Sequence, residues 1–345
     1  MKGRILGALV AAALLSVAAP ASATHVTCGQ TITVSTRLDS DVNCPSTFTQ
    51  YGLWIGADDV TLHLGHFTIR AGTPGLGGVG VAGGTRENPL SNVTVRGGSI
   101  EGFVYGGVGM FADNSSAIGL TTTSRGGGID FFGDGNEALL NDITIEQTGQ
   151  SRGGIRFAGN DAYAARNTIH GGQVGIGSFI PAAGGANNPR IAVNTIENCE
   201  QQGIYVDGYT DSAIVARNTV TGCNTGIQVQ TANPGAGGAE VRRNLVSQNS
   251  DGIRVSDPAS YVWCNTASDN RSGDGFFGEG IVVSGGELKE NTATGSVGYG
   301  IRAEPGTTDG GGNAAGGNGT SATDDECTIN IVCSAPPSTC PRTAP

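Results

Sequence analysis

Lysine is nearly absent from this chain, and histidine, tryptophan and methionine are scarce. Once Lys2 and Arg4 at the N-terminus are set aside, Lys289 is the one lysine that remains. The rest of the chain then has 17 basic and 30 acidic residues, a net charge of −13. Such a surface repels nucleic acid and anionic membranes, so we expect neither as a partner. Binding of a polyanion such as pectate would require a local arginine cluster or a bridging cation.

Long hydrophobic runs are missing after the first residues. Lys2 and Arg4 precede an apolar run, residues 5–19, and small residues follow at 21–23. The run is too short to span a bilayer and has the composition of a signal peptide. We therefore predict a signal peptide over residues 1–23 and a secreted, soluble mature protein, with the periplasm as the alternative location. No cysteine ends the run, so a lipoprotein anchor is not expected.

Cys-x-x-Cys motifs and histidine-rich clusters are also missing, so the eight cysteines are interpreted as disulfides and no metal site is predicted. Cys28 and Cys44 are expected to close an N-terminal cap over residues 24–50. Three more cysteines lie in a C-terminal cap or tail over residues 313–345, and one of them is expected to reach back, with Cys264 as a candidate. The remaining connectivity stays open. No cofactor is expected; calcium is left open, although no motif indicates it.

Helical periodicity is absent, and a repeat of roughly two dozen residues takes its place. From residue 160 onward an apolar residue, two variable residues, an asparagine, and then a polar and an apolar residue precede a turn and a Gly-Ile pair. Each unit holds short strands that can bury their apolar face only by stacking on the next unit. This predicts an all-β fold, a single-stranded parallel β-helix over residues 51–312. The six asparagines of the repeat are Asn167, Asn194, Asn218, Asn244, Asn265 and Asn291.

The units "ARNTVTGCNTGIQV" and "VRRNLVSQNSDGIRV", with the opening segment "ADDVTLHLGHFTIR", resemble the right-handed parallel β-helix repeat family of the pectin-lyase-like superfamily. The resemblance covers roughly residues 50–312 and implies a right-handed solenoid. That superfamily includes polysaccharide lyases, hydrolases and epimerases, phage tailspikes, adhesins and non-catalytic members. The clustered aspartates of pectate lyases and the Asp-Pro-His signature of mannuronan epimerases are missing here. The further aspartates, the Gly-His-Gly element and the Arg-x-Lys element of polygalacturonases are missing as well.

Several prominent residues are expected to be structural. Stacked asparagines can satisfy backbone groups at a turn, so the asparagine column is interpreted as a hydrogen-bonded ladder. Cys199 and Cys223 each lie five residues after a repeat asparagine and should stack on adjacent coils, as a disulfide or as a buried apolar pair. The pair Asp58-Asp59 is interpreted as a turn and not as a glycosidase carboxylate pair.

The candidate functional residues flank the inward isoleucine of each Gly-Ile strand, because alternate side chains of a strand point outward. This outer face is rich in Arg, Asp, Gln and Tyr, which suit carbohydrate; the alternative is a solvated face with salt bridges between coils. The first outward column is Asp130, Arg156, Gly177, Tyr205, Gln228, Arg254, Val282 and Arg302, and the second includes Asp207, Gln230, Ser256, Ser284 and Glu304.

Two functional hypotheses follow from this face. In the first, the protein binds an extracellular polysaccharide or cell-surface glycan, as a monomer, and in its catalytic form cleaves a uronic-acid polymer by β-elimination. Tyr205 or Arg254 would then abstract the C5 proton, and Arg156 or Arg302 would neutralise the carboxylate. Asp130 beside Arg156 is the rival pair, for hydrolysis or cation binding. The substrate-binding candidates are Asp130, Asp207, Gln228, Gln230, Arg302 and Glu304. In the second hypothesis, the protein is a non-catalytic structural, adhesion or glycan-binding protein.

Overall fold

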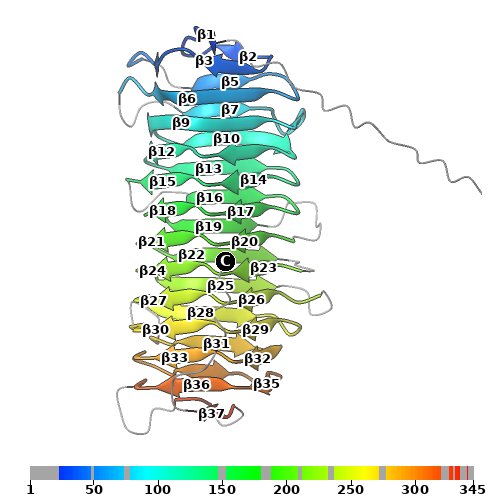
Figure 1. The fold of residues 1–345 in the computed structure, drawn as a ribbon, viewed down its shortest axis with the longest axis vertical. Helices are drawn as coiled ribbons and strands as arrows, with labels where there is room; N and C mark the ends of the chain where they lie inside the picture. The colour runs from blue at the N-terminus through cyan, green and yellow to red at the C-terminus, as the bar shows by residue number, and fades with distance from the viewer. Residues whose placement is uncertain are drawn as a thin grey trace, which may run out of the picture.

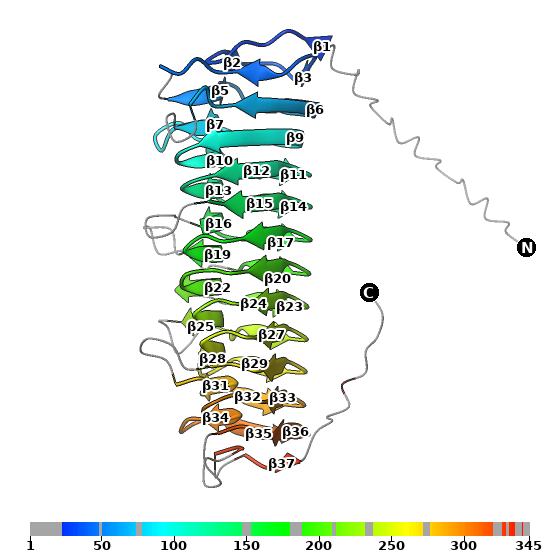
Figure 2. The same cartoon turned by 90° about the vertical axis from the view of Figure 1, so that its left-hand side faces the viewer.

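The computed structural model describes residues 23–47, 50–73, 78–146, 153–179, 188–208, 212–231, 237–271, 277–319, 326–328, 331–334 and 340. The predicted signal peptide, apart from residue 23, and most of residues 320–345 lie outside the described residues. All the regular elements of the described part are strands. Within that part, no helix is long and apolar enough to cross a membrane. The coils are stacked along one axis (Figures 1 and 2).

Each coil contributes one strand to each of three parallel ladders. The Gly-Ile sheet contains β2 (Thr31–Ile32), β5 (Tyr51–Ile55), β7 (Val79–Gly83), β10 (Gly106–Asp113), β13 (Gly127–Phe132), β16 (Gly153–Ala158), β19 (Val174–Phe179), β22 (Gln202–Gly208), β25 (Thr225–Thr231), β28 (Asp251–Ser256), β31 (Ile281–Ser284) and β34 (Ile301–Ala303), with β8 (Leu90–Ser91) paired to β10. Ladder 1 contains β11 (Ser116–Ile118), β14 (Glu137–Leu139), β17 (Tyr163–Ala165), β20 (Arg190–Ala192), β23 (Ile214–Ala216), β26 (Glu240–Arg242), β29 (Tyr261–Trp263), β32 (Glu287–Lys289) and β35 (Thr308–Gly311). Ladder 2 contains β12 (Thr121–Ser124), β15 (Asp142–Ile145), β18 (Thr168–His170), β21 (Thr195–Glu197), β24 (Thr219–Thr221), β27 (Leu245–Ser247), β30 (Thr266–Ser268), β33 (Thr292–Thr294), β36 (Asn313–Gly316) and β37 (Cys333–Ser334).

The first coils differ, because single long strands there serve both ladders. Strands β6 (Thr61–Arg70) and β9 (Thr94–Phe103) each run the full width that two strands cover further along the solenoid. The strand β9 pairs with both β11 and β12, so ladders 1 and 2 join in one sheet. The shorter strands before β6 are β1 (Ala23–Thr24), β3 (Thr36–Leu38) and β4 (Val42–Asn43).

The core is a set of straight rows of identical or similar apolar side chains. Ile204 lies over Ile227, which lies over Ile253, and all three are fully buried. The stack that the repeat predicts is therefore confirmed, with strands about 4.8 Å apart. Because each isoleucine contacts its counterparts above and below, a coil gains its hydrophobic burial from its neighbours and not from within itself.

A buried asparagine ladder fixes the corner between ladders 1 and 2. In each step the side-chain oxygen accepts two hydrogen bonds from the asparagine one coil earlier. Asn194, for example, donates from its backbone N–H and from Nδ2 to Asn218 Oδ1, at 3.0 Å each. The structural interpretation of the predicted column is confirmed, and the ladder is longer than the six predicted residues. It contains Asn141, Asn167, Asn194, Asn218, Asn244, Asn265, Asn291 and Asn313.

A second internal row corrects the disulfide prediction for Cys199 and Cys223. The two residues do stack on adjacent coils, but both are buried free thiols. The Cys199 backbone N–H donates to Cys223 Sγ at 3.3 Å, and the Cys223 N–H donates to Asn249 Oδ1 at 2.9 Å. The sulfur thus occupies the acceptor position that asparagine holds in later coils, so the buried-pair alternative is the correct one. The hydrogen bond with Cys223 and burial raise the pKa of the Cys199 thiol.

Three disulfides close the ends of the solenoid. Cys28 and Cys44 form the predicted N-terminal bridge. Cys264 pairs with Cys340, 76 residues later, which confirms that a C-terminal cysteine reaches back to the body of the solenoid. Cys327 and Cys333 form the third bridge. Disulfides of this number are typical of an exported protein.

Candidate functional site

The outer surface of the Gly-Ile sheet carries the predicted columns in register. Strand pairing places Asp130 over Arg156, Arg156 over Gly177, and Gly177 over Tyr205. The same column continues through Gln228 and Arg254. In the second column Asp207 pairs with Gln230, and Gln230 with Ser256. Predicted site residues that are far apart in the sequence therefore line one face.

A pocket of about 320 Å³ opens on this face where the column has no side chain. Gly177 separates Arg156 from Tyr205, and the ring of Phe179 lies against the glycine. A Cβ at residue 177 would come within 2.4 Å of Phe179 Cε2, so a larger residue there would displace the ring. The pocket is lined by Arg156, Gln173, Val174, Phe179, Gln201, Gln202 and Tyr205.

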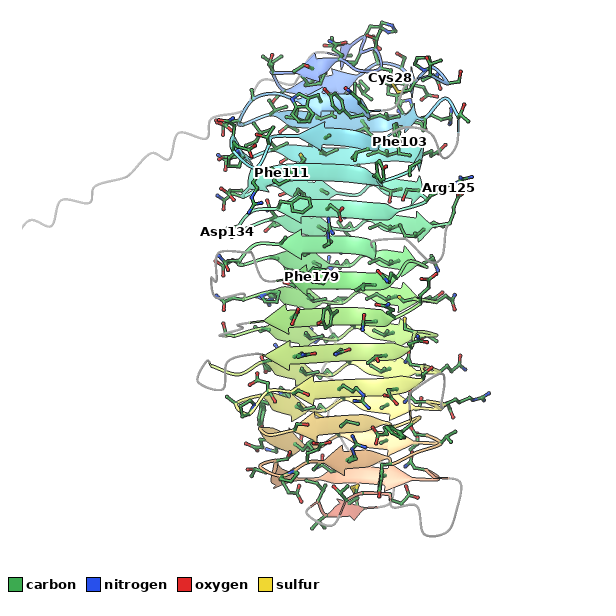
Figure 3. The ribbon with its side chains drawn as sticks, turned by 180° about the vertical axis from the view of Figure 1, so that it is seen from behind. Cys28, Phe103, Phe111, Arg125, Asp134 and Phe179 are labelled. Atoms are coloured by element: carbon green, nitrogen blue, oxygen red, sulfur yellow. A yellow bond between two sulfur atoms is a disulfide. The ribbon has the colours of Figure 1, made fainter. Side chains whose placement is uncertain are left out.

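Aromatic rings form one wall of the pocket. The rings of Phe179 and Tyr205 meet edge to face, with centroids 5.7 Å apart. In the second column, the ring of Phe111 stacks on the ring of Phe132 one coil later, with ring centroids 4.6 Å apart. Phe132 in turn pairs with Ala158, which lies two residues after Arg156 on the same strand. Figure 3 shows the labelled rings of Phe111 and Phe179 on the same face of the solenoid. An aromatic surface beside polar groups suits the apolar C–H faces of a sugar ring.

Polar side chains form the rest of the lining. Gln202 Nε2 donates to Gln228 Oε1 at 3.3 Å, and Gln228 Nε2 donates to Gln230 Oε1 at 3.2 Å, so the amides form a chain that leads away from the pocket. Burial, the nearby charge of Asp207 and a hydrogen bond with it raise the pKa of the Tyr205 phenol. Tyr205 is therefore neutral at physiological pH, with its O–H directed to Asp207 and its oxygen able to accept a hydrogen bond.

Arg156 is held in place at the opposite wall. Its Nη2 lies 3.1 Å from Asp130 Oδ2, and its guanidinium lies 5.0 Å from the ring centroid of Phe132. The Asp130 carboxylate is largely buried beneath this contact. The structure thus brings the predicted Asp130–Arg156 pair together, with the arginine and not the aspartate facing the pocket.

The remaining predicted residues belong to a second cluster further along the same face. Arg254 lies 2.8 Å from Asp251 and 3.2 Å from Glu279, and both carboxylates are buried. Arg302 also contacts Glu279, and it lies 3.2 Å from Glu304. Burial is the main cause that raises the pKa of Glu279. Because these guanidinium and carboxylate groups bind one another, the cluster links neighbouring coils and leaves few groups for a ligand.

Sequence reasoning missed Phe179, Gln202 and the two buried carboxylates of the arginine cluster. A signal was present for three of them, because Gln202, Asp251 and Glu279 each stand two residues before an inward isoleucine. Phe179 also had a signal, because it stands three residues after the inward Ile176, as Asp207 does after Ile204; the turn of its ring over Gly177 had none. Within the described residues, the side chains close enough to share a metal ion are Cys264, Glu290 and Cys340, and the two cysteines already form a disulfide.

A family model described as "Right handed beta helix region" matches residues 78–263. No curated protein sequence matches the chain significantly. Among solved structures, the Dettilon tailspike protein has a TM-score of 0.55 at 16% identity, over 84% of this chain and 63% of the tailspike. A mutant tailspike protein of E. coli bacteriophage HK620, in complex with a pentasaccharide, has a TM-score of 0.53 at 11% identity, over 82% of this chain and 60% of the tailspike. The chain therefore spans less than two thirds of either tailspike, and at these identities the likeness concerns the fold.

Proposed function

Because the chain belongs to the right-handed β-helix family, we propose that it is an exported protein that binds a polysaccharide in the pocket between Arg156 and Tyr205. The observation that carries this proposal is the composition of the pocket, which joins two aromatic rings, amide side chains and one arginine in about 320 Å³. Small-molecule sites fall in this size range and use a few polar groups to orient an otherwise apolar contact. The pocket is large enough for a short segment of a sugar chain.

The rest of the outer face supports a polymer more than a free sugar. The hydrogen bond from Gln202 to Gln228 advances one coil along the solenoid axis, and the one from Gln228 to Gln230 runs along strand β25. Amides present both a donor and an acceptor, as hydroxyl groups require. A linear polysaccharide can therefore lie along the stacked coils, with one residue held between Phe179, Tyr205 and Arg156.

Binding is tested with the purified mature protein on a panel of neutral and acidic polysaccharides. The variant Phe179→Ala removes an aromatic wall and is expected to abolish most of the affinity for any polysaccharide that binds. The matched control is Tyr105→Ala, which removes an aromatic ring that is 58% exposed and does not line the pocket. Equal losses in the two variants, or unchanged binding by Phe179→Ala, would refute the pocket as the binding site.

We propose lyase activity as the catalytic form of this function, with Tyr205 as base and Arg156 neutralising the substrate carboxylate. Proton transfer from C5 of a uronic acid to the phenolate would form the C4–C5 double bond and expel the oxygen at C4, leaving an unsaturated end. Of the two candidate bases, Tyr205 is favoured, because Arg254 is held by Asp251 and Glu279.

The raised pKa of Tyr205 gives this activity a distinct pH dependence. The rate should rise with pH into the alkaline range, because the phenolate is the reactive form. The assay follows the ultraviolet absorbance of unsaturated ends released from uronic-acid polymers, with Tyr205→Phe as the variant. Activity that survives in Tyr205→Phe would refute this base. Affinity without any absorbance change would instead identify a non-catalytic glycan-binding protein.

A further inference from the structure

A second basic surface lies on ladder 1, away from the Gly-Ile sheet. Three arginines precede asparagines of the buried ladder and stand at the corner that the ladder fixes: Arg166, Arg217 and Arg243. Two more, Arg190 and Arg242, lie on strands β20 and β26 beside them. We call these five residues the arginine strip. They are five of the 17 basic residues that remain once Lys2 and Arg4 are set aside.

Backbone hydrogen bonds show that the corner positions stack directly. The N–H of Arg166 donates to Ala192 O, the N–H of Val193 to Ala216 O, and the N–H of Arg217 to Arg242 O. The corner row thus reads Arg166, Val193, Arg217 and Arg243 on four successive coils. With coils about 4.8 Å apart, its guanidinium groups follow the solenoid axis over roughly 15 Å.

The strip has an uncharged floor of small residues. Strand pairing aligns Ala165, Ala192 and Ala216 in one outward column between the corner row and the column of Arg190. Ala165 and Ala216 are buried, so a bound chain would contact the guanidinium groups beside this column and not the alanines themselves. The column on the far side carries Arg190 between Tyr163 and Ile214. Beyond the corner, ladder 2 adds a column of half-exposed hydroxyl groups from Thr168, Thr195 and Thr219.

Aromatic rings mark both ends of the strip. The guanidinium of Arg190 lies 5.8 Å from the ring centroid of Tyr163. At the other end, those of Arg242 and Arg243 lie 5.9 Å and 5.0 Å from the ring centroid of Trp263. Glu240 accepts a hydrogen bond from Trp263 Nε1 at 3.2 Å and pairs with Arg242 at 2.8 Å. The end near Trp263 is thus ordered by protein contacts, whereas Arg166 and Arg217 are exposed to solvent.

We propose that the arginine strip binds a linear anionic polysaccharide, one that carries carboxylate or sulfate groups on its repeating units. Guanidinium groups bind both anions through paired hydrogen bonds, and the threonine hydroxyls suit the uncharged parts of a sugar chain. The acidic remainder of the protein repels every polyanion, so binding must come from the local charge of the strip, and single-stranded DNA serves as the comparison polymer. This site lies outside the pocket of the Gly-Ile sheet and does not depend on the function proposed for that pocket.

The test measures binding of the mature protein to polygalacturonate and to dextran sulfate at low salt, with neutral dextran and a single-stranded DNA oligonucleotide as comparisons. The variant pair Arg166→Gln and Arg217→Gln removes two exposed charges of the strip. The matched control is Arg86→Gln with Arg125→Gln, two exposed arginines elsewhere; Arg125 extends away from the solenoid at its edge (Figure 3). Both double variants change the net charge by the same amount.

We expect the strip variant to lose roughly fivefold to tenfold in affinity for at least one of the two anionic polymers, since each exposed ion pair contributes modestly. The control should change little, and added salt should release the polymer. Equal losses in both double variants, binding of neutral dextran with equal affinity, or tighter binding of the DNA would each overturn the proposal. The variant Phe179→Ala separates the two sites. If only Phe179→Ala lowers the affinity for the polymer, the strip is not its binding site. If only the strip variant lowers that affinity, the pocket is not the binding site for that polymer.

Discussion

The asparagine ladder makes a quantitative prediction for Asn218→Ala. The Asn218 side chain accepts two hydrogen bonds from Asn194, at 3.0 Å each, and donates one each to Ile191 O and Asn244 Oδ1, also at 3.0 Å. All four are buried. Truncation to alanine removes them together and leaves the Asn194 backbone N–H without its acceptor in the interior.

The expected cost follows from these contacts. An orphaned buried N–H costs about 1–3 kcal/mol, and each of the other hydrogen bonds contributes about 1 kcal/mol net. We therefore expect Asn218→Ala to lower the free energy of unfolding by about 4–6 kcal/mol. In a solenoid the loss should be concentrated in the coils on either side, because each coil contacts only its neighbours.

The assay is urea denaturation combined with hydrogen exchange of the amides in β20 to β27. The matched control is Asn88→Ala, at an exposed turn residue, which should change the free energy of unfolding by less than about 0.5 kcal/mol. A loss below about 1 kcal/mol in Asn218→Ala, or exchange that rises evenly along the whole solenoid, would refute this reasoning.

Four further predictions concern single positions. Val193 has a left-handed backbone conformation, with a φ of 61°, and its side chain is 46% exposed. Because asparagine adopts this conformation more easily than valine, Val193→Asn should stabilise the protein by about 1 kcal/mol and raise its Tm. An unchanged Tm would contradict this. Cys199 and Cys223 should be protected from a thiol reagent in the folded protein, and two thiols should react once the protein is unfolded in the absence of reductant. If no thiol reacts after unfolding, the two residues form a disulfide. Burial and two nearby arginines lower the pKa of His63 in the folded state, so its contribution to stability is present above the unfolded value of about 6.5 and is lost as the pH falls through the folded pKa. Urea denaturation at several pH values should show a smaller loss on acidification in His63→Gln, and an identical loss would contradict this. Gly177→Ala should displace the Phe179 ring and weaken polysaccharide binding while the Tm stays nearly unchanged.

The architecture could be predicted from the sequence because it depends on a repeat. Once the asparagines align, the positions of Ile204, Ile227 and Ile253 follow, and the outward columns follow from strand alternation. The ladder is longer than predicted at both ends. The unit at Asn141 carries the full pattern but precedes residue 160, where the repeat becomes regular, and the unit at Asn313 keeps the asparagine without a following Gly-Ile pair. A repeat therefore fixes which residues share a face even where single units diverge.

The detailed chemistry of the site could not be predicted in the same way. Stacking alone does not show that Arg254 faces buried carboxylates or that Asp130 is covered by Arg156, because both depend on side-chain rotamers. The pairing of Cys199 with Cys223 was open for the same reason. Two sulfurs on adjacent coils are within reach of a disulfide, and only the orientation of Cys223 toward the Cys199 N–H decides against it.

The most direct test of the binding pocket is a crystal structure of the mature protein with an oligosaccharide from the polysaccharide that binds most tightly in the panel. We expect a sugar ring against Phe179 and Tyr205, with a hydroxyl or carboxylate group within hydrogen-bond distance of Arg156. A sugar bound on another face, with the space over Gly177 unoccupied, would contradict the proposed function.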